Sequence, residues 1–355
     1  MSISNTLEPR LRRRNLLPLL EARFFRSGLP LSLAAQLLGS IQADIDLFEQ
    51  RLDAALQSDV ELVHQVARYL APLKGKRLLP ALAVLSARAV GGWDDRIIDA
   101  GVAVEMIHTA TMIHDDVVDT AGLRRGKETV NAAWDSHIAV LMGDFLLSRA
   151  LNILVGLKNQ QALETVSRVT ERLSQGEIYE IQIGLQTDTR EASYFAMVSD
   201  KTASLIAASC KLGPILVGAP QKTIEAMGQY GEALGLAFQI ADDVLDFTGD
   251  ADTLGKPVGH DLREGKITLP LIRALAAAGP KERAAAEALL KQADKSEEAW
   301  GRLVGFVEQH QGLNSARQTA RQYGARAEQC LKILPASFSR MALEQAARLV
   351  VDRDN

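Results

Sequence analysis

The sequence is poor in cysteine, aromatic residues and net charge, and each shortage excludes a class of protein. Of the 355 residues only two are cysteines, Cys210 and Cys330, which are too few for a disulfide framework and lack metal-ligand spacing. Only 5% are aromatic, and a formal net charge of -4 is too small to predict a nucleic-acid partner. Two isolated cysteines are typical of core residues in a reducing compartment, so we expect a cytoplasmic protein.

Long uncharged apolar runs are also missing, since none reaches the roughly 18 residues of a membrane span. The first 30 residues differ from the rest, because six arginines against two glutamates give them a local charge of +4 and leave -8 for the remainder. Pro18, Glu21 and Arg23 interrupt any secretory signal core. We expect residues 1–30 to form a basic extension, either an amphipathic segment that contacts an anionic membrane or an extra helix or arm.

Residues 31–355 are dominated by helical periodicity. The stretch 33–56, "LAAQLLGSIQADIDLFEQRLDAAL", repeats apolar residues at i, i+3, i+4 and i+7, and glycine and proline then punctuate similar stretches to the end. No stretch alternates with period two for long enough to indicate a sheet. These patterns predict an all-α, single-domain bundle of about a dozen helices around a central cleft.

Two aspartate clusters stand out in this apolar background. They are "IHDDVVD" (113–119) and "IADDVLD" (240–246), which share the pattern D-D-x-x-D. Residues four apart lie on one helix face, so Asp115 pairs with Asp119 and Asp242 with Asp246. Carboxylates in an apolar setting need cations, and magnesium prefers a few carboxylates together with waters and substrate phosphates. Two facing pairs would form a cleft able to hold a polyphosphate.

A solvated helix face is the ordinary explanation of one such cluster, but both copies here have apolar neighbours on each side. Di-iron bundles also use carboxylates, although they require Glu-x-x-His pairs that do not flank these clusters. A basic segment follows each cluster, "GLRRGK" at 122–127 and "LGKPVGHDLREGK" at 254–266. Arginine and lysine are the usual phosphate-binding residues. The combination therefore favours metal-assisted binding of a diphosphate.

These motifs resemble those of the trans-isoprenyl diphosphate synthases, or polyprenyl synthetases. The resemblance covers residues 40 to 353 and rests on both aspartate motifs with their basic segments, on "QGEIYE" (175–180), on "SDKTASL" (199–205) and on "ALEQAARLVVDR" (342–353). It implies the isoprenoid synthase fold, a homodimer and a long-chain enzyme like the octaprenyl and heptaprenyl diphosphate synthases. It also implies head-to-tail condensation of an allylic diphosphate with isopentenyl diphosphate, dependent on Mg²⁺ (three ions).

The resemblance assigns roles to individual residues. The implied metal ligands are Asp115 and Asp119 on one side and Asp242, Asp243 and Asp246 on the other. The implied ligands of the allylic diphosphate are Arg124, Lys201, Lys256 and Lys266, with Thr202 and Gln239 near the developing cation. The implied ligands of isopentenyl diphosphate are Lys76, His108 and Arg125. The catalytic set is thus Asp115, Asp119, Asp242 and Lys201. His108 lies two helical turns before Asp115 on the same stripe, whereas for His114 we expect only packing.

Product length is implied by the positions four and five residues before the first aspartate. In the family a bulky aromatic there blocks the growing chain, but here they are Thr111 and Ala110, so products of six or more isoprene units are expected.

Three residues depart from the family pattern. Lys74 replaces a glycine, Leu79 replaces an arginine that helps to bind isopentenyl diphosphate, and Glu180 replaces a glutamine. The alternatives are a same-fold enzyme with another second substrate or coupling mode, and a non-catalytic subunit of a heteromeric synthase.

Overall fold

The structure is a computed structural model, and it describes residues 39–71, 77–124, 126–248, 259–292 and 296–352. The predicted N-terminal extension lies outside these ranges. So do three of the predicted substrate ligands, Lys76, Arg125 and Lys256, and the substituted position Lys74.

The described chain is almost entirely helical, which confirms the predicted fold class. The first half contains α3 (Gln42–Ala55), α4 (Glu61–Leu70), α5 (Leu78–Ala89), α6 (Arg96–Val118), α7 (Val130–Ala133), α8 (Ser136–Gly156) and α9 (Gln160–Gln186). The second half contains α10 (Glu191–Val198), η3 (Ser199–Ala203), α11 (Ser204–Leu216), α12 (Gln221–Thr248), α14 (His260–Arg263), α15 (Leu269–Ala277), α16 (Pro280–Leu290), α17 (Glu297–Gln309), α18 (Gly312–Cys330), η4 (Leu331–Ile333) and α19 (Phe338–Val351).

One short antiparallel hairpin interrupts the helices after the first aspartate cluster. Strand β1 (Leu123–Arg124) pairs with β2 (Lys127–Glu128), and Gly126 in the turn has a φ of 74°, a conformation that glycine adopts without strain. The sequence did not predict this hairpin, because two residues a strand are too few to show a period-two pattern. Its effect is to fold the basic segment back along the chain.

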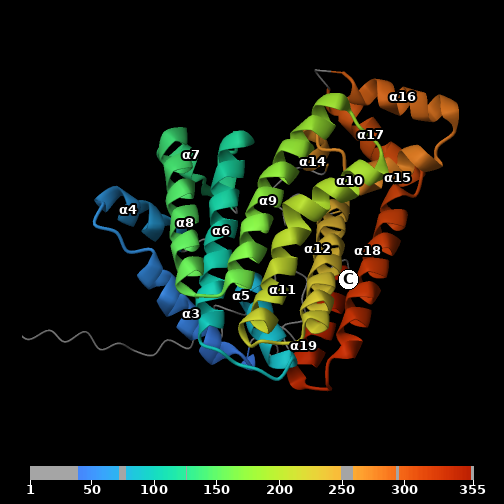
Figure 1. Cartoon of the computed structure of the whole chain (residues 1–355). Helices are drawn as coiled ribbons and strands as arrows, with labels where there is room; N and C mark the ends of the chain where they lie inside the picture. The colour runs from blue at the N-terminus through green and yellow to red at the C-terminus, as the bar shows by residue number, and fades with distance from the viewer. Residues whose placement is uncertain (1–38, 72–76, 125, 249–258, 293–295, 353–355) are drawn as a thin grey trace, which may run out of the picture.

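The long helices pack side by side around α6 and α11 (Figure 1). α6 packs against α5, α8 and α9, while α11 packs against α5, α9 and α12. α6 is buried along most of its first four turns, from Ile97 to Ala110, which explains why its apolar residues show no clear amphipathic stripe. The last turns of α6 and α12 carry the two aspartate clusters, so the packing of these helices positions the site.

Two apolar cores support this arrangement. One lies among α3, α5, α6, α8 and α11, with Phe48, Leu82 and Ile107 almost fully buried. The other joins the end of α12 to α10, α15, α17 and α18, with Tyr194, Leu271 and Leu303 at its centre. Each aspartate helix therefore has a firm core behind it.

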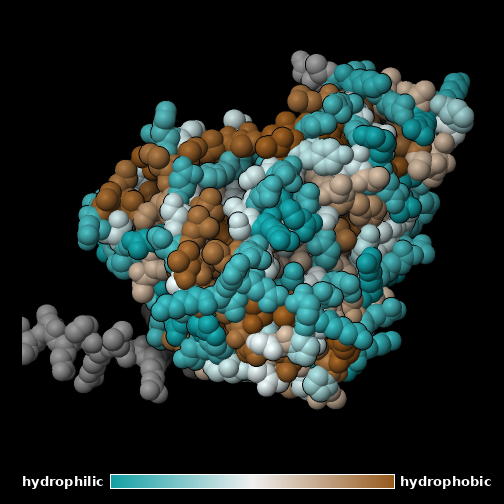
Figure 2. Space-filling model, in the orientation of Figure 1, coloured by the Kyte–Doolittle hydropathy of each residue, from teal (hydrophilic) through white to brown (hydrophobic). Residues whose placement is uncertain are grey.

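The helix α8 has an unusually apolar exposed surface. It is long and apolar enough to cross a membrane by length and composition, and about a third of its most apolar window is buried inside the protein. Figure 2 shows hydrophobic surface where α8 runs on the face in view. The exposed apolar residues of this helix are Val140, Leu141, Leu151 and Val155.

Candidate active site

The first aspartate cluster ends α6. Asp115 is half-buried in the last turn, and Asp119 is the exposed C-cap residue whose backbone N–H donates to the Asp115 carbonyl at 2.8 Å. Burial, with Glu177 of α9, raises the pKa of the Asp115 carboxyl to about 7 against the opposing effect of Lys201 and Arg124. A carboxylate in this setting is stabilised by an added cation.

Arg124 reaches the same end of α6 through the β1–β2 hairpin. Its Nε donates to Oδ1 of Asp116 at 2.7 Å, and the Asp116 side chain is nearly buried. Asn131 Nδ2 donates to the backbone carbonyls of Asp116 and Ala121, which ties the hairpin base to the helix. Asp116, for which the motifs predicted no role, thus holds a predicted diphosphate ligand in place.

Lys201 and Thr202 lie in η3, a turn of π-helix between α10 and α11. Such insertions are frequent at functional sites. The turn fits tightly between two helices, because a Cβ on Gly176 of α9 would lie 2.5 Å from the backbone nitrogen of Lys201. On the other side, a Cβ on Gly235 of α12 would lie 2.5 Å from the Ala203 Cα. Only glycine allows both approaches, so these two residues fix where Lys201 leaves the backbone.

The Lys201 ammonium contacts two carboxylates of α9. Its Nζ lies 2.6 Å from Oε2 of Glu177 and 2.5 Å from Oε2 of Glu180. Burial alone would lower the pKa of Lys201, but Glu180 and Glu177 outweigh it and raise the pKa to about 12. Lys201 is therefore positively charged at any physiological pH.

The second aspartate cluster lies on α12 and continues a hydrogen-bond chain from Thr202. The Thr202 hydroxyl donates to Gln239 Oε1 at 2.9 Å, and Gln239 Nε2 donates to Asp243 Oδ1 at 2.9 Å. The Tyr194 hydroxyl donates to the other Asp243 oxygen at 2.6 Å. Burial raises the pKa of Asp243 to about 8 in spite of these hydrogen bonds. Asp243 thus orients Gln239, and both of its oxygens accept hydrogen bonds, so its assignment as a metal ligand stays a prediction.

Asp242 and Asp246, by contrast, are only half-buried, one turn apart on α12. Asp246 accepts from the backbone N–H of Asp261 through Oδ2 at 3.2 Å, and its carbonyl accepts from Gly259 N–H at 2.9 Å. These contacts anchor the start of α14 against the aspartate helix.

Lys266 joins the two sides of the site. It follows α14 in the chain, yet its Nζ lies 3.5 Å from Oδ2 of Asp119 on α6, as well as 2.8 Å from Oε2 of Glu264. Burial would lower the pKa of Lys266, but Glu180, Glu264 and Asp119 raise it. A lysine of the second motif therefore contacts an aspartate of the first, as the cleft hypothesis requires.

The donor set fits magnesium bound together with a phosphate ligand. Within the described ranges, no three His, Cys, Asp or Glu side chains converge into a preformed metal centre. Magnesium does not need one, because it keeps several waters and binds through one or two carboxylates plus phosphate oxygens. Asp115 with its raised pKa, Asp119, Asp242 and Asp246 could supply such carboxylates. Glu177, which affects Asp115, is a further carboxylate that the sequence did not assign.

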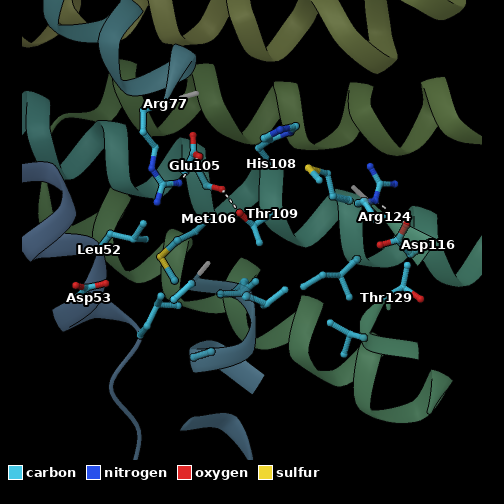
Figure 3. Close-up of a pocket in the computed structure, with 18 of the residues that line it drawn as sticks. Leu52, Asp53, Arg77, Glu105, Met106, His108, Thr109, Asp116, Arg124 and Thr129 are labelled. Atoms are coloured by element: carbon cyan, nitrogen blue, oxygen red, sulfur yellow. Dashed lines mark hydrogen bonds and ion pairs between the residues drawn. The ribbon is translucent and has the colours of Figure 1, made fainter. Parts of the chain in front are cut away.

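The side of the site that is predicted to bind the second substrate is built around α5 and α6 (Figure 3). Arg77 precedes α5 with a left-handed φ of 53°, and its guanidinium contacts Glu49 at 2.8 Å and Glu105 at 2.6 Å. Leu79 is 7% exposed and belongs to the main core. His108 faces a cavity of about 110 Å³ that Arg77, Glu105, Asp116 and Arg124 also line. Of the predicted ligands here, the structure describes His108 alone.

The residues predicted to set product length lie on another side of α6. Ala110 is 2% exposed, and the Thr111 hydroxyl donates to the His108 carbonyl at 2.9 Å. Neither lines the cavity of Figure 3. His114 packs against α8, where a Cβ on Gly143 would meet its ring at 2.2 Å and where its Nε2 lies 3.1 Å from the Val140 carbonyl. Packing is thus sufficient to account for His114.

Comparison with known proteins places this chain in a family. The profile of the family described as Polyprenyl synthetase matches residues 60–306. An all-trans-nonaprenyl-diphosphate synthase (geranyl-diphosphate specific) of Rhodobacter capsulatus is 37% identical over 89% of this chain and 97% of its own length. Component 2 of a heptaprenyl diphosphate synthase from Geobacillus stearothermophilus is 34% identical over 88% of this chain and 96% of its own.

A solved structure agrees with these sequences. The polyprenyl synthase of Caulobacter crescentus CB15, complexed with calcium and isoprenyl diphosphate, superposes with a TM-score of 0.84 at 36% identity. The match covers 90% of this chain and 97% of that one. Sequence and fold therefore agree over nearly the whole described chain, which belongs to the polyprenyl synthetase family.

Proposed function

We propose that the protein is a magnesium-dependent prenyltransferase that makes a long-chain, all-trans polyprenyl diphosphate of six or more isoprene units. It would extend an allylic diphosphate by successive condensations with isopentenyl diphosphate. The observation that carries the proposal is the contact of Lys266 with Asp119, because it puts the cations of one motif beside the carboxylates of the other. The Caulobacter relative, named as a complex with calcium and isoprenyl diphosphate, supports the same ligand chemistry.

In this mechanism the chain's own residues bind and orient the diphosphate. Asp115, Asp119, Asp242 and Asp246 would hold the magnesium ions, which neutralise the charge of the leaving group. We infer three such ions by analogy with the family. Arg124, Lys201 and Lys266 would bind the phosphate oxygens as negative charge develops on them, which stabilises the transition state.

Bond breaking and bond making then follow in order. The C1–O bond of the allylic substrate breaks and its electron pair leaves with the diphosphate. The Thr202 and Gln239 oxygens, held by the hydrogen-bond chain that ends at Asp243, would stabilise the cation with the negative ends of their dipoles. The double bond of isopentenyl diphosphate attacks C1, and a proton passes from its C2 to the departing diphosphate. No side-chain base is required.

The primary test is turnover by the purified chain alone, with magnesium, labelled isopentenyl diphosphate and several allylic primers. We expect incorporation of label and a product of six or more units. Incorporation only after a second protein is added would support a subunit role instead, which the component 2 relative makes a real alternative. Consumption of the allylic substrate without label would support another coupling mode.

Product length has its own test. Ala110 is small and buried, so a phenylalanine there would fill space beside α6. Ala110→Phe should shorten the product to about three or four units, while Ala139→Phe, at a buried alanine of α8 that follows the hairpin, serves as a packing control. An unchanged product distribution in Ala110→Phe would remove Ala110 from the tunnel wall.

A homodimer in the cytoplasm is the proposed form of the enzyme. The support for the dimer is the exposed apolar residues of α8 together with Ile178, Ile181 and Leu185 of α9, which are exposed by 66%, 45% and 83%. Three residues at i, i+3 and i+7 lie on one helix face and favour a partner helix there. Leu185→Glu combined with Leu141→Glu should shift the protein to monomer in analytical ultracentrifugation.

A further inference from the structure

Lys201 has more carboxylate partners than it needs in order to be held in place for a diphosphate. Glu177 and Glu180 lie three residues apart on α9, so they share a face, and both reach the same ammonium. A single carboxylate would be enough to hold Lys201 in place. With two, the group of three side chains carries a net charge of -1 where a diphosphate is expected to bind.

Glu180 also acts on the second diphosphate lysine. Its charge raises the pKa of Lys266, together with Glu264 and Asp119. Lys266 and Lys201 come from different parts of the chain, and Glu180 is the side chain that influences both. Glu177 differs, because its other effect is on Asp115 and thus on the metal side.

We propose that Glu180 is a positioning residue that competes with diphosphate for Lys201, and that it thereby promotes diphosphate release after each condensation. The proposal rests on the proposed function. An ammonium has three N–H donors, and two of them face Glu177 and Glu180. A diphosphate must therefore use the third donor or displace Glu180, and in either case it meets an added negative charge.

Repeated elongation requires that diphosphate leave the site after each round. Each condensation leaves an inorganic diphosphate in the site and the new allylic diphosphate must occupy the same cations. A carboxylate that returns to Lys201 as the diphosphate leaves lowers the affinity for the spent product. Tighter binding would slow the next round, since binding that is equal for product and transition state does not speed turnover.

Glu180→Gln tests this with almost no change of shape. The amide oxygen can still accept from Lys201, but the charge is gone. We expect inorganic diphosphate with magnesium to bind roughly five- to thirty-fold more tightly in calorimetry. Its inhibition constant and the KM for the allylic substrate should fall by similar factors, while the KM for isopentenyl diphosphate stays unchanged. Glu180→Asp, which retains the charge, should remain close to wild type.

Glu171→Gln is the matched control, since it removes one exposed charge from the same helix nine residues earlier, about 13 Å away. It should leave the affinity for diphosphate unchanged. Unchanged or weaker binding of diphosphate by a folded Glu180→Gln variant would overturn the proposal. So would diphosphate binding by Glu180→Asp that is clearly tighter than in the wild type, because that variant retains the charge. If Glu180→Gln binds diphosphate more tightly but the wild type never incorporates isopentenyl diphosphate, Glu180 keeps its role in diphosphate binding and the proposed function is refuted.

Discussion

The two halves of the site treat their cations differently. On the allylic side, Lys201 and Lys266 are 22% and 23% exposed and contact carboxylates that a diphosphate can replace. On the second-substrate side, Arg77 is only 10% exposed and is clamped by Glu49 and by Glu105, which is itself 7% exposed. The two lysines of the first half can exchange their carboxylate partners for a ligand. Arg77 in the second half is held in ion pairs that stabilise the fold.

This difference bears on the departure at Leu79. An arginine that binds the buried Glu105 and the half-buried Glu49 cannot turn toward a ligand without leaving both carboxylates unpaired, which is costly. Arg77 is therefore no substitute for the arginine missing at position 79. Compensation would have to come from Lys74 or Lys76, which lie outside the described residues.

The largest effect is expected when a predicted metal ligand of the allylic half is removed. Asp115→Ala or Asp242→Ala should lower kcat by about a thousand-fold or more, because the leaving group loses neutralising charge. EDTA should stop the wild type, and magnesium should restore it. Thermal unfolding is the control, since neither change removes a core side chain. A wild-type rate in either variant would refute the metal assignment.

The next largest effect is expected on stability, because Arg77 is held in ion pairs that stabilise the fold. Arg77→Ala should lower the free energy of unfolding by about 3 kcal/mol, because it leaves Glu105 buried without its partner and removes the guanidinium from the face of Phe48. The matched control is Arg348→Ala, which breaks an exposed pair with Glu328 and should cost about 1 kcal/mol or less. Equal losses in denaturant titrations would show that Arg77 is an ordinary surface residue, and the contrast between the two halves would disappear.

A smaller effect is expected where the second half lacks its arginine. Leu79→Arg should lower the KM for isopentenyl diphosphate by roughly ten- to a hundred-fold, the value of a charge-assisted hydrogen bond, and leave the allylic KM alone. Leu79→Met preserves the apolar volume and should change neither constant. An unchanged KM in Leu79→Arg, together with loss of activity in Lys74→Ala, would indicate a rewired second-substrate site.

The smallest effect concerns Asp115 without metal. Its native pKa of about 7 exceeds the ordinary 3.8, so the native state binds its proton more tightly than the unfolded chain does. The metal-free protein should therefore lose stability as the pH rises from about 4 to about 7, and no more above that. Asp115→Asn should raise the Tm by about 2–4 °C at pH 8 and by less at pH 5. The exposed Asp59→Asn is the control, and a gain that does not depend on pH would contradict the raised pKa.

Much of the fold and half of the site could be predicted from sequence, because both depend on local periodicity. The 3.6-residue pattern predicts the helices, and the four-residue spacing predicts that Asp115 and Asp119 share a stripe. The pairing of Asp116 with Arg124 is less visible. It depends on a hairpin of two-residue strands, too short to leave a pattern.

The remaining contacts depend on packing between distant segments. Arg77 meets Glu49 and Glu105, each 28 residues away, from a backbone conformation that the sequence does not reveal. The grip of Glu177 and Glu180 on Lys201 requires the side-chain direction set by the π turn. The spacing of the two glutamates on α9 was a signal that they share a face, but not a signal of what they face.

The π turn of η3 also constrains how this chain can change by insertion and deletion. α10, η3 and α11 form one continuous rod with an extra residue accommodated at Ser199–Ala203. Deleting one residue there would restore an ordinary α-helix and rotate everything before it by about 100° relative to α11. Lys201 would leave the site, and the contacts at Gly176 and Gly235 would fall on other side chains. Insertions and deletions should therefore be tolerated in the loops between helices but not within these five residues. Related sequences are expected to differ in loop length while this segment keeps a fixed length.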